Sequence, residues 1–408
     1  MSKWEEKRLE DIIDVNPPVK LKKGESYPFI DIDKVSPTRR SVTNEEVKVY
    51  DGQSSSKFCD GDTVFSRITP CLENRKIAKV SINGDAAFGS TEFYVFRAKK
   101  KKADARFTYY LTSSDAVVLP AINSMTGASG RQRADKRFIQ RLKLNLPDLP
   151  TQERIADILS AYDDLIEANN HRIELLEQTA QELYREWFVR FRFPGYENAK
   201  FEDGIPEGWS YVRFGKAIDI IDGDRGVNYP KQEEFYPEGD CLFLNAGNVT
   251  TKGFDFSSCA YITKEKDAIL RKGKVQHGDV LLTTRGTVGN VAFYNETMTF
   301  SEMRINSGMV ILRNLGVVSP EYIYTSLRHE YLQKLMTMYA SGSAQPQLPI
   351  KDMKRMKIIK PDIKTMERFT EMSADIYNQI SLLIMKNQTL AKQRDMLLPR
   401  LMSGKLEV

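Results

Sequence analysis

Residues 141–153 read Arg-Leu-Lys-Leu-Asn-Leu-Pro-Asp-Leu-Pro-Thr-Gln-Glu, and residues 355–361 read Arg-Met-Lys-Ile-Ile-Lys-Pro. In both segments apolar and polar residues alternate before a proline, which predicts a short strand that stops there. The two strand-ending prolines are 214 residues apart. A helical stretch without internal Pro or Gly follows each of them, at residues 151–191 and 365–398. The sequence therefore predicts two units, each ending in a strand, a proline and a long helix.

Two earlier segments recur in the same order, which supports an internal duplication. The segment Trp4–Ile13 resembles Trp209–Ile218, and Asp60–Phe65 matches His277–Leu282 with a Gly-Asp pair at the same place. Both copies read as strands entered through a Gly-Asp turn.

The fold class that follows is α+β: a tandem duplication of a mostly β domain, each copy followed by a long helix. A shorter helix is expected over Pro320–Met338. The expected domains are the first β-rich domain, a central helix, a linker with the second β-rich domain, and a C-terminal helix, over residues 1–150, 151–192, 193–362 and 363–408.

Composition excludes several classes of protein. The 408 residues are 41% hydrophobic and 28% charged, which is typical of globular domains. No apolar run is long enough to span a bilayer, and the N-terminus lacks an apolar signal core, so we expect a cytoplasmic protein. The 3 histidines are not at metal-ligand spacing and the 4 cysteines contain no CxxC pair, so we expect no metal site and no disulfide framework.

The two long helices carry matching apolar seams with alternating steps of three and four residues, typical of a coiled coil. Setting Asn169 opposite Asn387 in an antiparallel pair brings Ile155 to Leu401, Tyr162 to Arg394 and Trp187 to Phe369. A buried Asn pair costs stability but fixes the register, because a slip would bury an amide against leucine. The alternative is that each helix packs on its own domain and both Asn side chains face solvent. The seams are Ile155, Leu159, Tyr162, Ile166, Asn169, Ile173, Leu176, Ala180, Leu183 and Trp187, and Phe369, Ser373, Ile376, Ile380, Leu383, Asn387, Leu390, Arg394, Leu397 and Leu401.

Motifs that could carry catalysis are weak. Asn16-Pro17-Pro18-Val19 resembles the loop of adenine methyltransferases, but valine replaces the aromatic residue that stacks on the base, and no cofactor-binding strand precedes it. Gly286 and Gly289 form a lone glycine pair without the Gly-Lys-Ser/Thr of a phosphate loop. Asp148 and Asp362 follow the duplicated prolines and indicate turns more than a nuclease site. The sequence predicts no catalytic residue.

Basic and glycine-rich loops recur in both units and predict contact with DNA. Glycine and serine let a backbone approach phosphates, while Arg and Gln can read base edges. The alternative for any single cation is a solvated surface residue. The candidate DNA-binding residues are Arg67, Thr69, Arg75, Ser129, Arg131, Gln132, Arg133 and Lys136 in the first unit, and Thr284, Arg285, Ser343, Gln345, Gln347 and Lys351 in the second.

Several of these segments together resemble one family, the DNA-specificity subunits of type I restriction–modification systems. The carriers are Trp4 with Leu9-Glu-Asp-Ile-Ile13, Phe65-Ser-Arg-Ile-Thr-Pro70, the Gly-Ser loop before Arg131, Leu146-Pro147 followed by Thr151-Gln-Glu153-Arg-Ile155, Phe193-Pro-Gly195 and Gly204-Ile-Pro206-Glu-Gly208-Trp209. The second unit departs from the pattern, with Lys364-Thr-Met-Glu367 in place of Thr151-Gln-Glu153.

The resemblance implies a non-catalytic chain with two target recognition domains, each reading one half of a bipartite, asymmetric site in double-stranded DNA. It implies two modification subunits, which methylate adenine with S-adenosylmethionine, and restriction subunits, which use ATP and Mg²⁺; this chain itself would bind no cofactor. Two other functions are left open: a stand-alone adenine methyltransferase, which would bind S-adenosylmethionine as an isolated chain, and a coiled-coil scaffold, which would give the duplicated basic loops no role.

Overall fold

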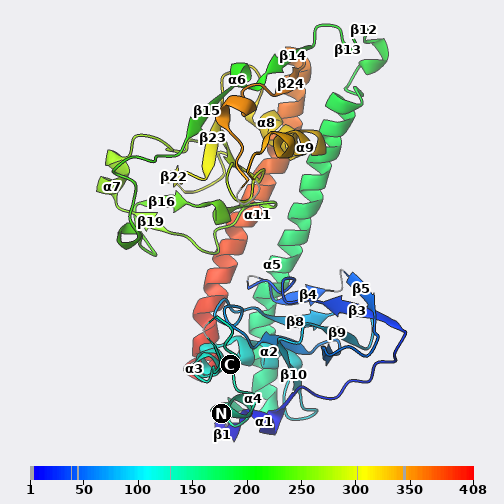
Figure 1. The fold of residues 1–408 in the computed structure, drawn as a ribbon, viewed down its shortest axis with the longest axis vertical. Coiled ribbons are helices and arrows are strands. Elements are labelled where there is room, and N and C mark those ends of the chain that lie inside the picture. The colour runs from blue at the N-terminus through cyan, green and yellow to red at the C-terminus, as the bar shows by residue number, and fades with distance from the viewer. Residues whose placement is uncertain (1–3, 38, 44–45, 129, 301, 343–345) are drawn as a thin grey trace. The chain divides into compact units, whose positions relative to one another are not determined.

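The computed structural model describes residues 4–37, 39–43, 46–128, 130–300, 302–342 and 346–408. The chain divides into two compact units. The first unit comprises Met1–Ile166 and Leu390–Val408, and the second comprises Glu167–Thr389. Each unit therefore contains a β-rich part together with sections of the two long helices, α5 (Leu149–Tyr184) and α11 (Ile363–Met402) (Figure 1).

The first unit is built on a five-stranded sheet and a four-stranded sheet. Its central strands β7 and β10 are entirely apolar or buried over Thr63–Phe65 and Phe93–Phe96, which is why they occupy the middle of the larger sheet. The strands of the five-stranded sheet are, in spatial order, β2 (Ile13–Val15), β10 (Phe93–Ala98), β7 (Thr63–Ser66), β8 (Ile77–Ser81) and β4 (Ser41–Thr43). Those of the four-stranded sheet are β5 (Glu46–Val49), β3 (Ser26–Ile30), β9 (Ala87–Gly89) and β6 (Ser56–Phe58).

A separate antiparallel pair joins the two ends of the first β-rich part, β1 (Trp4–Arg8) and β11 (Lys143–Pro147). Side chains of α5 and of the C-terminal segment enter the same apolar core, where Leu401 and Ile155 are both fully buried and Trp4, Leu406 and Val408 pack at the edge. The short helices of this unit are α1 (Leu9–Ile12), α2 (Ala105–Ser113), α3 (Asp115–Asn123) and α4 (Lys136–Gln140).

The second unit repeats this plan with a four-stranded and a three-stranded sheet. The four-stranded sheet has the order β15 (Ile218–Asp222), β23 (Met309–Asn314), β20 (Asp279–Thr283) and β21 (Val291–Tyr294), and the three-stranded sheet β19 (Tyr261–Ile262), β16 (Cys241–Leu244) and β22 (Met303–Ile305). Two-stranded pairs are β14 (Ser210–Arg213) with β24 (Lys357–Lys360), β12 (Phe201–Glu202) with β13 (Ile205–Pro206), and β17 (Val249–Thr250) with β18 (Gly253–Phe254). The helices are α6 (Phe214–Ala217), α7 (Lys264–Ile269), α8 (Pro320–Arg328), α9 (Glu330–Tyr339) and α10 (Ile350–Met353).

The predicted duplication is confirmed by a buried Asp–Arg ion pair that is found at the equivalent position of each unit. Arg97 forks onto Asp62 at 2.6 and 2.7 Å, and Arg313 forks onto Asp279 at 2.7 and 2.8 Å. The two aspartates are 2% and 1% exposed, so each carboxylate depends on its arginine for compensation.

The recurring Gly-Asp turn has the same geometry in both copies. Asp62 accepts a hydrogen bond from the backbone N–H of Cys59 at 2.7 Å, as Asp279 does from that of Gln276 at 2.7 Å. The preceding glycines, Gly61 and Gly278, have φ values of +79° and +87°, a conformation that side chains with a Cβ rarely adopt.

The two long helices begin at equivalent residues, 149 and 363. Each start lies two positions before the stretch without Pro or Gly from which the helix was predicted. Asp148 accepts from the backbone N–H of Thr151 at 3.2 Å, and Asp362 accepts from that of Thr365 at 2.9 Å. Both aspartates are therefore helix caps, which confirms turns at these sites. The departure of the second unit from the Thr-Gln-Glu pattern leaves its helix start unchanged, because the capping Asp and Thr are retained.

Three helix boundaries differ from the predicted ones. The first long helix changes at its end into a π-helical turn over Arg185–Val189. The second continues through Pro399 to Met402. The single helix expected over Pro320–Met338 was wrong: α8 and α9 are separated by His329, whose extended backbone (ψ 141°) breaks the helix without Gly or Pro.

The long helices pack together as an antiparallel pair, and in the second unit the predicted Asn layer is confirmed. The Nδ2 of Asn169 donates to Oδ1 of Asn387 at 2.8 Å, and Nδ2 of Asn387 donates to Oδ1 of Asn170 at 2.9 Å. Trp187 and Phe369, expected to face each other, have ring centroids 6.1 Å apart. The alternative in which the two amides face solvent is excluded by these hydrogen bonds.

In the first unit the helix pair contains a buried charge that the seam analysis did not anticipate. Arg394 was expected opposite Tyr162, but its Nη1 lies 2.5 Å from Oδ1 of the next residue, Asp163. The other carboxylate oxygen of Asp163 accepts from the hydroxyl of Tyr110 on α2 at 2.5 Å. Asp163 is 3% exposed, so the ion pair compensates a charge removed from water.

Replacing Arg394 by methionine should lower the free energy of unfolding by about 3 kcal/mol, because Asp163 would be left buried without its cation. Urea unfolding followed by circular dichroism measures this change. The matched control is Lys392→Met, an exposed side chain on the same helix, which should change stability by less than about 0.5 kcal/mol. Adding Asp163→Leu to Arg394→Met should recover part of the loss; no loss in Arg394→Met itself would contradict the assigned role.

The Asn layer predicts a non-additive pair of substitutions. Asn387→Leu alone should cost about 1–3 kcal/mol, because Asn169 would keep a poorly hydrated amide without its partner. Asn169→Leu together with Asn387→Leu should be close to neutral or stabilising, because both polar groups are then replaced by packed apolar ones. A thermal-unfolding double-mutant cycle tests this, and additive effects would show that the two amides are not coupled.

Candidate nucleic-acid interface

In the first unit, two of the predicted DNA-binding loops are joined to each other. One loop follows β7 and contains Arg67 and Thr69; the other precedes α4 and contains Gln132 and Arg133. Ile68 and Arg133 form an isolated β-bridge. The backbone N–H of Thr69 donates to the carbonyl of Gln132 at 3.0 Å, and the N–H of Gln132 donates to Oγ1 of Thr69 at 3.1 Å. Four candidates from distant parts of the sequence are therefore brought together, with Thr69 buried and Arg133 exposed. We call Arg67, Thr69, Gln132 and Arg133 the first loop pair.

The remaining candidates of the first unit lie in different surroundings. Arg131 is exposed within the turn closed by the bridge between Thr126 and Arg133, and Lys136 begins α4. Arg75 is engaged elsewhere: it donates to the carbonyl of Ser113 at 3.1 Å and pairs with Asp115. Ser129 lies outside the described residues.

Sequence reasoning missed the residue that organises the first loop pair, Glu92. Its carboxylate accepts from Nε of Arg67 at 3.1 Å and from Nε and Nη2 of Arg133 at 2.9 and 2.6 Å. The hydrogen bond from Arg133 holds the pKa of Glu92 below its usual value, against the opposing effect of burial. The available signal was a single acid directly before the buried strand Phe93–Phe96, which does not by itself indicate a partner.

The second unit joins the equivalent loops in the same way. Arg285 and Gln347 form an isolated β-bridge, and the N–H of Leu348 donates to the carbonyl of Thr284 at 2.9 Å. Thr284 Oγ1 also donates to the carbonyl of Gly308 at 3.2 Å. We call Thr284, Arg285 and Gln347 the second loop pair. Ser343 and Gln345, two further candidates in this loop, lie outside the described residues.

Two cations of the second unit differ in their surroundings. Lys351 is exposed on α10. The Nε of Arg285 is buried and has no hydrogen-bond partner among the residues that the structure describes.

The two loop pairs share a backbone plan but differ in side chains. Arg67 N–H donates to the carbonyl of Glu92 at 2.9 Å, and Thr284 N–H donates to that of Gly308 at 2.8 Å. Gly308 therefore occupies the place of Glu92, and the second loop pair has no carboxylate at this position. Gln347 likewise occupies the place of Arg133.

The weak catalytic motif Asn16-Pro17-Pro18-Val19 is a structural turn. Asn16 has a positive φ of 56°, and its Oδ1 accepts from the backbone N–H of Val95 at 2.8 Å. Its own N–H donates to the carbonyl of Val95 at 2.7 Å. The side chain that would hold an adenine amino group is thus bound to a strand of its own domain.

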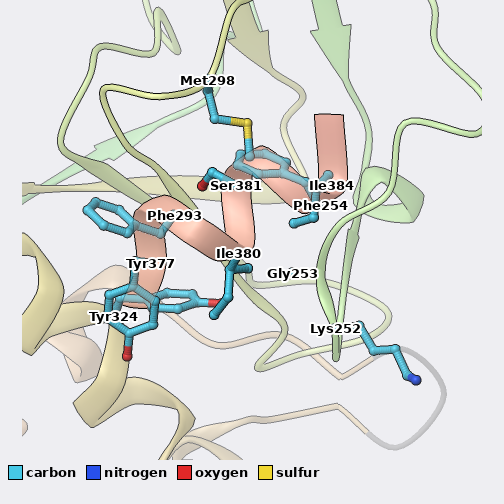
Figure 2. A pocket seen from close by; sticks show the side chains of 10 residues that line it. All are labelled: Lys252, Gly253, Phe254, Phe293, Met298, Tyr324, Tyr377, Ile380, Ser381 and Ile384. Atoms are coloured by element: carbon cyan, nitrogen blue, oxygen red, sulfur yellow. The ribbon is translucent and has the colours of Figure 1, made fainter. Parts of the chain in front are cut away.

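Two hollows of the second unit have linings that contain no residue of the loop pairs. One is lined by the aromatic rings of Phe293, Tyr324 and Tyr377 and by Met298 (Figure 2), and its volume of about 10 Å³ has room for roughly one water. A more open hollow of about 490 Å³ lies where Val317 and Val318 approach the start of α11.

Within the described ranges, no three His, Cys, Asp or Glu residues are grouped to hold a metal ion. Nor does any helix in those ranges have the length and apolar character needed to cross a membrane.

A β-rich domain that occurs twice, each time with a joined pair of loops and a long helix, defines an internally duplicated protein. The sequence matches the family described as type I restriction modification DNA specificity domain over residues 1–178 and again over 206–390. The chain belongs to this family, and it is a DNA specificity subunit of a type I restriction–modification system, the non-catalytic component of such a system.

Individual relatives agree with this assignment. The type I restriction enzyme MjaIX specificity subunit of Methanocaldococcus jannaschii is 24% identical, over 99% of this chain and 94% of that protein. The HindI specificity subunit of Haemophilus influenzae is also 24% identical, over 88% of this chain and 90% of that protein. The crystal structure of a type I restriction-modification S subunit from M. genitalium covers 98% of this chain and 96% of its own, with a TM-score of 0.53 at 13% identity, and therefore has the same fold.

Proposed function

We propose that each β-rich domain reads one half of a bipartite, asymmetric site in double-stranded DNA through its own loop pair. The observation that carries the proposal is the repeated joining of two candidate loops by one backbone plan, with Arg67, Glu92 and Arg133 in one unit and Thr284, Gly308 and Gln347 at the equivalent places in the other. Equivalent frameworks with different exposed side chains, Arg133 in one unit and Gln347 in the other, present different donors and acceptors to base edges, so the two half-sites differ.

The same proposal assigns the chemistry to partner subunits. Two modification subunits, which carry S-adenosylmethionine, would methylate adenine in the DNA that this chain selects, and restriction subunits would supply ATP- and Mg²⁺-dependent cleavage. This chain would bring DNA and modification subunits together. The alternative of a stand-alone adenine methyltransferase loses its support, because Asn16 is bound to Val95. Isothermal titration of the isolated chain with S-adenosylmethionine distinguishes the two, since only the methyltransferase alternative expects binding.

Cations that contact phosphates should reveal themselves through the salt dependence of binding. Arg131→Ala, Lys136→Ala and Lys351→Ala should each reduce the slope of log K against log salt by about one, because each removes one counterion-releasing contact. Fluorescence anisotropy over a salt series measures the slope. Lys392→Ala, an exposed cation on α11, is the control and should leave the slope unchanged. Unaltered slopes in all three variants would remove these residues from the interface.

Exchange of one domain should alter one half of the target. We expect a chain in which residues 1–150 are replaced by the equivalent domain of another specificity subunit to direct adenine methylation to a site with one new and one original half. Mapping methylated adenines in the genome of cells that express the chain with its modification subunits measures this. A change in both halves would show that recognition is not divided between the domains.

A further inference from the structure

The arrangement around Glu92 restricts how Arg133 can use its donors. Arg133 directs Nε and Nη2 at the carboxylate, so one edge of its planar guanidinium is occupied. Its Nη1 makes no hydrogen bond to the residues that the structure describes, and Nη2 carries a second N–H. The outward edge of the fork, formed by Nη1 and Nη2, is therefore available to a ligand.

Arg67, the less exposed of the two arginines, also holds the carboxylate of Glu92. Arg67 donates its Nε to Glu92, and its guanidinium lies 5.5 Å from the ring centroid of Tyr94. The hydroxyl of Tyr94 donates to the carbonyl of Ala134 at 2.7 Å, next to Arg133. The side chain of Arg67 is 29% exposed and that of Glu92 20%, whereas that of Arg133 is 45% exposed. Arg133 is therefore the most exposed member of the trio.

Glu92 is not itself suited to contact DNA. Both of its oxygens already accept hydrogen bonds, Oε1 from Arg133 and Oε2 from both arginines. A carboxylate beside phosphates would be repelled, but with two arginines the trio has a net charge of +1. Its effect is to fix the plane of Arg133, which limits the rotamer freedom that a long side chain would lose on binding.

We propose that Arg133, held in orientation by Glu92, reads a guanine in the half-site of the first domain. Two parallel N–H groups at the outward edge of the fork match O6 and N7 of guanine in the major groove, the commonest specific contact of arginine with DNA. This inference rests on the proposed function and adds the base class that the first domain selects. The second domain has Gly308 and Gln347 at the equivalent positions, so it cannot use the same buttressed arginine.

The test replaces a single atom of the DNA. The full chain, bound to its modification subunits, is titrated with duplexes of the mapped target in which each guanine of the first half-site in turn is replaced by 7-deazaguanine. At one position the wild-type complex should bind roughly ten-fold more weakly, because the N7 acceptor is lost. Arg133→Ala should bind the unmodified duplex more weakly and show no further loss at that position.

The Glu92→Gln variant tests whether the carboxylate of Glu92 orients Arg133 for its contact with guanine. It keeps the size of the side chain and removes the charge, so we expect it to reduce the effect of 7-deazaguanine at the same position while the salt slope changes little. Arg131→Ala, in the same loop, is the matched control: it should weaken binding to all duplexes and keep the full 7-deazaguanine effect. Circular dichroism melting verifies that each variant is folded, and the Arg133→Ala cycle decides the question even if Glu92→Gln does not fold.

The results distinguish a failure of the guanine contact from a failure of the proposed function. If the wild-type complex binds a bipartite target but no guanine is sensitive, or Arg133→Ala keeps the sensitivity, the guanine contact is wrong and the proposed division of recognition stands. If the complex has no bipartite target, the proposed function itself fails.

Discussion

The hydrogen bond between Asn169 and Asn387 sets which residues of α5 meet which residues of α11. An antiparallel pair of apolar seams could pack in several registers that differ by one heptad and bury similar area, so apolar contact alone does not select one. The amide pair selects one, because every other register would place a polar group against an aliphatic side chain. In the first unit, the ion pair of Asp163 with Arg394 adds a second condition on the same two helices. The buried Asn pair lowers stability, but it leaves a single register for the two helices.

The features that the two units share are buried or structural, whereas those that differ are side chains of the loop pairs. The Asp–Arg forks, the Gly-Asp turns and the capped helix starts are retained, because a buried carboxylate without its arginine or a helix end without its cap would be costly. The loop pairs keep only their backbone bonds. Glu92 and Gly308 differ in side chain but have the same backbone role, since both use their carbonyl oxygens to hold the neighbouring loop.

The sequence predicted the features that depend on local periodicity. The strand ending at Pro147 and the long helices follow from spacing, and the Asn layer follows once the two helices are paired antiparallel. Glu92 could not be predicted, because its role arises from two loops that meet only after folding. Asp163 was missed for a similar reason: it lies off the heptad seam, and its partner Tyr110 is on another helix. The break at His329 has no Gly or Pro to mark it. Of the candidate DNA-binding residues, the structure joins those of the two loop pairs, while Arg75 is engaged by the turn between α2 and α3.

The core of the first unit includes Leu397 and Leu401, which the ribosome adds only after the whole of the second unit. During synthesis, the nascent first unit therefore exposes the apolar surface around Ile155 and Leu159 while residues 167–389 are still being made. Domains generally fold as units in the order of synthesis, and exposed apolar surface in the interval favours aggregation. In this chain the unit that is synthesised first is the last to have all of its residues. The time needed to translate the second unit therefore sets how long the apolar surface of the first unit stays exposed.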